Sequence, residues 1–76
     1  MKYYLMIRQT DTPGEYTGII DANQNNKSTA TPFNNKVYDT TQIGIMFNDA
    51  VQDFLIKKNK GDELIFPNIM PPIVKP

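Results

Sequence analysis

The chain has 76 residues, with eight Lys and Arg against eight Asp and Glu, and it contains neither cysteine nor histidine. A chain this short forms one domain and buries only about 60% of its unfolded surface, so oligomerisation or a partner is its remaining source of burial. It lacks disulfides, thiolate zinc ligands and the usual acid–base catalyst near neutral pH. Its zero net charge fits neither a basic nucleic-acid binder nor an acidic DNA mimic.

The N-terminal segment does not have the pattern of a secretion signal. Its apolar run is short and ends at Arg8. No apolar stretch approaches the roughly 20 residues of a membrane span. We therefore expect a cytoplasmic protein without a membrane partner.

The first part of the chain predicts a β-hairpin. Residues 3–9 and 15–21 are rich in aromatic and β-branched residues, and Pro13 and Gly14 favour a turn between them. Because side chains alternate between the two faces of a strand, the first strand has apolar side chains on each face. This pattern indicates a central strand or one covered on both sides. Gly18 indicates a bulge or a close approach of the backbone.

A polar, asparagine-rich loop is expected over residues 22–36. No hydrophobic repeat runs through it, and loops of this length are usually functional or disordered; of the two, we favour disorder. Alternatively, the end of this loop forms a short third strand within residues 33–38.

A helix pattern covers residues 42–60. Asp39 and Gln42 have the spacing of a capping box, with Thr41 as an alternative cap, and Gly61 follows as a C-terminal stop. An apolar stripe facing a core is expected at Ile43, Met46, Phe47, Ala50, Val51, Phe54 and Leu55.

Residues 62–66 predict a final short strand that ends at Pro67. The predicted fold class is therefore α+β: a small antiparallel sheet of three to four strands with one helix on one face. We expect one domain over residues 1–67 and an extended, proline-rich apolar tail over residues 68–76. Pro71 and Pro72 exclude a helix in the tail.

No catalytic, cofactor-binding or metal-binding residues are predicted. The glycines are scattered, no nucleophile motif occurs, and Ser28 lies in the polar loop. Asp49 and Asp53 are spaced by one helical turn, but Asp53 and Lys57 share this spacing, which favours an ordinary surface ion pair. We therefore expect a protein that is not an enzyme.

The tail is the candidate binding segment. A terminus that is merely frayed is usually polar, whereas this one is apolar, and exposed apolar patches usually mark contacts. The predicted partner-binding residues are Phe66, Ile69, Met70, Ile73 and Val74.

The order of elements resembles the HicB-like antitoxin domain. The resemblance is carried by Met1-Lys2-Tyr3-Tyr4, the strand–turn–strand, the helix from Ile43, and Gly61-Asp62-Glu63 before a proline-terminated strand. It covers roughly residues 1–67 and implies a partial ribonuclease-H-like fold that binds a protein partner. No DNA-binding module follows, so the resemblance does not imply autoregulation.

The leading hypothesis is a small protein-binding module, a homo-oligomer that neutralises a toxin. One alternative is a phage or mobile-element inhibitor of a host defence enzyme, of the anti-CRISPR type. Another is a single-stranded nucleic-acid binder that uses Tyr4, Tyr16 and Arg8, although the even charge makes nucleic acid an unfavoured partner.

Overall fold

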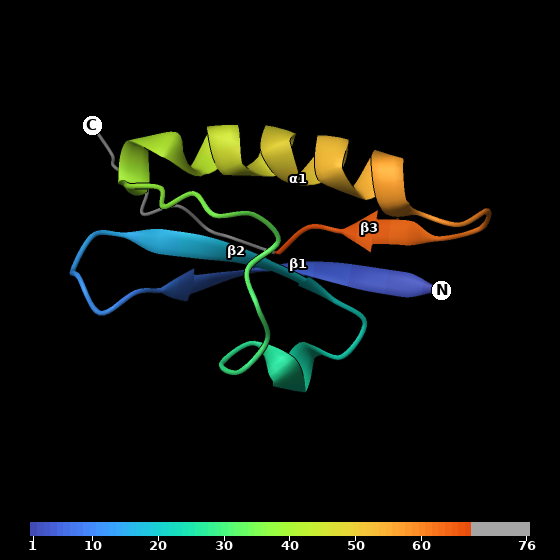
Figure 1. Cartoon of the computed structure of the whole chain (residues 1–76), viewed down its shortest axis with the longest axis horizontal. Coiled ribbons are helices and arrows are strands. Elements are labelled where there is room, and N and C mark those ends of the chain that lie inside the picture. Colours follow the sequence, from blue (N-terminus) through green and yellow to red (C-terminus); the bar gives the residue numbers. More distant parts are fainter. Residues whose placement is uncertain (68–76) are drawn as a thin grey trace, which may run out of the picture.

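The first strand lies at the centre of a three-stranded sheet (Figure 1). In the computed structural model, which describes residues 1–67, β1 (Lys2–Gln9) lies between β2 (Tyr16–Asp21) and β3 (Glu63–Ile65). β1 and β2 form the predicted antiparallel hairpin, whereas β3 runs parallel to β1. The α+β class is confirmed, but the sheet is mixed rather than antiparallel. The segment at Tyr38 runs antiparallel to β2, and the helix that follows crosses over, so that β3 runs in the direction of β1.

The hairpin turn has the geometry that its residues favour. Glu15 N–H donates to the carbonyl oxygen of Thr12 at 3.1 Å, and Gly14 has φ +82°. A proline at the second position of a four-residue turn and a glycine with positive φ at the third are the signature of a type II turn.

The helix begins as predicted. The carboxylate of Asp39 accepts the Thr41 N–H at 2.8 Å, and the Asp39 N–H donates to the side chain of Gln42 at 3.0 Å, which completes a capping box. The first turn is the 3-10 helix η2 (Thr40–Gln42), and α1 (Ile43–Lys57) continues from it.

The core lies between α1 and the sheet. Met46, Ala50 and Phe54 are buried on α1, and the rings of Phe54 and Tyr3 pack edge to face with their centroids 5.8 Å apart. Leu55 was expected in this stripe but is 61% exposed. It lies about 140° around the helix axis from Ala50, too far to reach the sheet.

The helix ends at Lys57, three residues before its predicted end at Lys60. Lys58 is extended (φ −71°, ψ 153°), and a separate turn follows in which Asp62 N–H donates to the carbonyl oxygen of Asn59 at 3.0 Å. Asp62 also accepts the Asn59 N–H at 3.0 Å. Gly61, with φ +91°, belongs to this turn and not to the helix end.

The polar loop has a defined path, contrary to the preference for disorder. Its 3-10 helix η1 (Gln24–Asn26) covers the face of the sheet opposite α1 (Figure 1). The loop then returns along β2, where Tyr38 and Tyr16 exchange backbone hydrogen bonds of 2.7 and 2.8 Å. The optional third strand is thus reduced to a single bridge.

Candidate functional site

The two edges of the sheet differ. The returning loop occupies the outer edge of β2 through the Tyr38 bridge and through Phe33, whose N–H donates to the carbonyl oxygen of Gly18 at 2.9 Å. Within residues 1–67, no strand pairs with the outer edge of β3. In the part of the chain that the structure describes, β3 is therefore the edge at which another strand can add.

At the centre of β3, the backbone N–H and C=O groups of one residue point away from β1. Glu63 N–H donates to the carbonyl oxygen of Met1 at 3.0 Å, so the peptide groups of Glu63 face β1. Successive residues of a strand direct these groups to opposite sides. The N–H and C=O of Leu64 consequently point to the open edge.

Phe66 continues this edge towards the helix. Its ring meets the ring of Phe47 on α1 edge to face, with centroids 5.2 Å apart, and the residue remains 40% exposed. Of the predicted binding residues, Phe66 alone lies within the described part of the chain; Ile69, Met70, Ile73 and Val74 lie outside it.

The side of α1 above β3 carries a row of apolar residues. Phe47, Val51 and Leu55 recur at every fourth position, so they follow one side of the helix, and the contact of Phe47 with Phe66 identifies that side. Val51 is half-buried and Leu55 is exposed. We call these three residues, together with the outer edge of β3 and Phe66, the β3 side.

The charges of α1 lie away from the β3 side. Asp49 accepts the hydroxyl of Tyr38 at 2.7 Å and approaches Lys36 Nζ at 3.4 Å, both on the loop that covers β2. Burial is the main cause that raises the pKa of the Tyr38 hydroxyl. Asp53 pairs with Lys57 at 3.0 Å, which confirms the predicted surface pair. The acids of the helix are thus engaged in structural contacts.

Two cavities flank the sheet. One, of ≈ 340 Å³, lies between the end of α1 and the loop at Phe33, with the paired Asp53 and Lys57 at its rim. The other, of ≈ 380 Å³, lies beside the end of β3 and is lined by Tyr4, Leu5, Met6, Gln24, Ile65, Phe66 and Pro67. The second cavity is mainly apolar and adjoins the point where the described chain ends.

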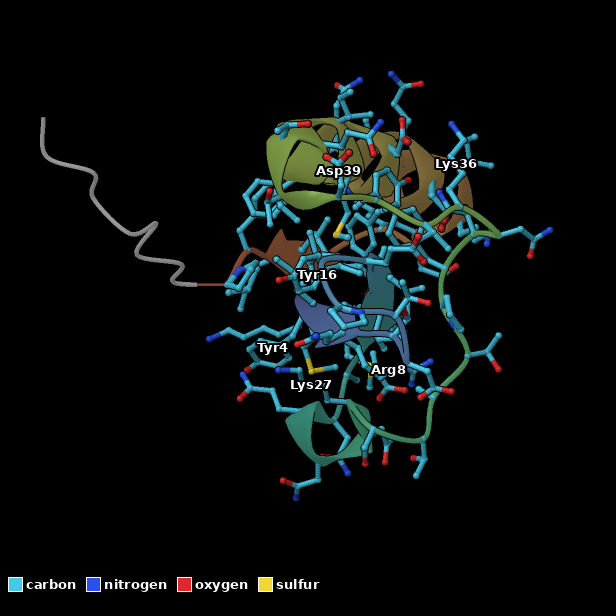
Figure 2. The ribbon with its side chains drawn as sticks, turned by 90° about the vertical axis from the view of Figure 1, so that its left-hand side faces the viewer. Tyr4, Arg8, Tyr16, Lys27, Lys36 and Asp39 are labelled. Carbon is cyan, nitrogen blue, oxygen red and sulfur yellow. The ribbon has the colours of Figure 1, made fainter. Side chains whose placement is uncertain are left out.

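The three residues of the nucleic-acid alternative do not share a face. Figure 2 shows Tyr4 and Arg8 on the side of the sheet that carries η1, and Tyr16 on the side of α1. The Arg8 guanidinium donates to the carbonyl oxygens of Lys27 at 3.1 Å and Ala30 at 2.9 Å. It therefore fastens the loop to the sheet, and the rings do not form one stacking platform.

Among residues 1–67, no group of three or more acidic, histidine or cysteine side chains could hold a metal ion. No helix in that range is long and apolar enough to cross a membrane.

Phe66 belongs both to the predicted binding residues and to the β3 side, but the sequence prediction did not include the rest of the β3 side. Val51 and Leu55 were assigned to the core stripe, and Leu64 was given no role. A helical projection with Ala50 at its centre would have placed Leu55 outside the buried face. The open edge could not be found in this way, because it depends on where β3 pairs.

Comparison with known proteins adds no relatives. No protein-family model matches the chain, and no curated protein or solved structure matches it either.

Proposed function

We propose that this chain is a non-enzymatic protein-binding module that neutralises a protein partner in the manner of an antitoxin. The observation that carries the proposal is the exposed Phe66, which packs on Phe47 at the end of β3 and leads the chain into the apolar residues of the tail. Exposed apolar residues that adjoin one another usually mark a contact with a partner.

The order of elements supports the antitoxin form of the proposal. The HicB-like resemblance implies three strands, a helix and a last strand. The chain has β1, β2, the Tyr38 bridge, α1 and β3 in that order.

The test is partner capture by the full chain from a lysate of the organism that encodes it. A variant with Ile69, Met70, Ile73 and Val74 changed to serine keeps the length and prolines of the tail but removes its apolar side chains. We expect this variant to lose the captured partner, with a dissociation constant at least about ten-fold higher, because burial of apolar surface is the main favourable term in most protein–protein association. Lys75→Ser is the matched control and should retain the partner.

The captured protein is then purified and its activity measured with and without the chain. A small ribonuclease toxin that the chain inhibits supports the antitoxin role, whereas an inhibited defence nuclease or signalling enzyme would establish the mobile-element alternative instead. Equal capture by the serine variant and the full chain would rule out the tail as the binding segment.

A further inference from the structure

We propose that the β3 side is a self-association surface, through which two copies of the chain pair β3 against β3 in antiparallel orientation about a two-fold axis. This inference deepens the proposed function by naming a second copy as the occupant of the β3 edge. The tail residues then remain for the foreign partner.

The backbone geometry fits pairing centred on Leu64. Its N–H and C=O point outward, because those of Glu63 are directed to β1. Two antiparallel copies can therefore exchange both hydrogen bonds at this residue, as a hydrogen-bonded antiparallel pair does. The same register sets Glu63 opposite Ile65 of the other copy, so the two carboxylates do not face each other.

The helix layer favours a second copy over an isolated peptide strand. The apolar row at Phe47, Val51 and Leu55 lies above the open edge, on the same side of the molecule. A single added strand would cover the edge but leave this row exposed. A second copy brings an equivalent helix with its equivalent edge, and both layers become buried at once.

The distribution of charge also favours contact between the β3 sides of two identical copies. A two-fold axis sets identical surfaces together, so any charge near it meets its own copy. The three charged residues of α1, Asp49, Asp53 and Lys57, all lie outside the apolar row, and two of them form one ion pair. The row can therefore meet its copy without repulsion.

β3 has two of the usual protections of an edge strand, its short length and the charge of Glu63, but it lacks the others. Lysine, an internal proline or a bulge commonly prevents such strands from pairing. None of these occurs within Glu63–Ile65, whose last two residues are apolar. In the proposed register Glu63 lies opposite Ile65 of the other copy, and the apolar row of α1 offsets the small number of hydrogen bonds that so short a strand can make.

Light scattering and sedimentation of the purified full chain test the proposal. Between about 1 µM and about 500 µM, a range in which interfaces of ordinary size associate, we expect the mass to approach twice the 8.7 kDa of one chain. Leu55→Lys should raise the dissociation constant at least about ten-fold, because it places a charge inside the apolar row.

Ile56→Lys is the matched control. Ile56 is the next residue and is 82% exposed, but it lies on the other side of α1 from Phe47. The control should remain dimeric. If both lysine variants weaken association equally, or if the unaltered chain stays monomeric across the range, the β3 side is not the self-association surface.

Leu64→Pro tests the backbone contribution. It removes an N–H that points away from β1, a position at which edge strands tolerate proline. We expect a folded monomer by circular dichroism and sedimentation, and a folded dimer would overturn the pairing. The outcome is separate from partner capture: a monomeric chain that still captures its partner through the tail refutes this inference and leaves the proposed function intact.

Discussion

Gly18 of β2 lies against the ring of Phe33, on the loop that covers this edge of the sheet. A Cβ built on Gly18 would enter the Phe33 ring and lie 3.2 Å from the sulfur of Met46. The uninterrupted register from Tyr16 to Asp21 excludes a bulge here. Of the two expectations for Gly18, the close approach is therefore the one that holds, and the approaching group is an aromatic ring.

Gly18→Ala should destabilise the chain by about 1–3 kcal/mol, the usual cost of forcing a methyl group into a packed core. The measurement is urea unfolding followed by circular dichroism. Gly44→Ala is the control: its Cβ meets nothing within 4 Å, and alanine should add up to roughly 1 kcal/mol in the helix. Equal stabilities of the two variants would mean that Phe33 does not pack on Gly18.

At the scale of elements, the start of the helix depends on an ionised carboxylate. The Thr41 hydroxyl donates to Asp39 at 2.6 Å, and this hydrogen bond is the main cause that lowers the pKa of the Asp39 carboxyl. The turn after the helix has a similar device. The Asn59 N–H, first among several causes, lowers the pKa of Asp62.

These shifts predict how stability depends on pH. Because both pKa values are lower in the folded chain than in the unfolded chain, the unfolded chain binds more protons in acid. Their contribution is complete above the ordinary aspartate pKa of about 3.9 and is lost as the pH falls through the folded value. The urea concentration at the midpoint of unfolding should therefore decrease as the pH is lowered from about 5 to about 2.

Asp39→Asn keeps an acceptor at the helix start but does not titrate there, so its midpoint should fall less over the same pH range. Asp11→Asn, which removes an exposed carboxylate outside the caps, should follow the unaltered chain. A steeper acid loss in Asp39→Asn than in the unaltered chain would contradict the assignment of the cap.

At the scale of the whole molecule, the sheet is covered on both faces by different means. α1 buries apolar side chains on one face. On the other face the loop that carries η1 is held by polar contacts, among them the hydrogen bonds from Arg8 to Lys27 and Ala30 (Figure 2). The loop layer should therefore open more easily than the helix layer.

Arg8→Met keeps the aliphatic stem of the side chain but removes both hydrogen bonds. Losing about 1–2 kcal/mol of local stability should speed trypsin cleavage after Lys27 about ten-fold, where cleavage follows loop opening. Cleavage after Lys36, on the part of the loop fastened to α1, provides the internal reference. Parallel increases at both sites would indicate global destabilisation instead of a lost anchor.

The β3 side also belongs to this scale, because residues from distant parts of the chain form it. The sequence predicted each element that contributes to it, including Phe66. It did not predict that Phe47, Val51 and Leu55 lie above an open strand edge. That arrangement follows from the parallel pairing of β3 with β1, which no local pattern specifies.

The sequence by itself determined the elements whose causes are local. The turn at Pro13 and Gly14, the hairpin and the capping box at Asp39 each depend on residues within a few positions of one another, whose backbone preferences are intrinsic. Only the tertiary structure decided the parallel β3, the outward position of Leu55 and the packing of Phe33 on Gly18. These depend on contacts between residues far apart in the chain, where packing and not local preference decides which arrangement is most stable.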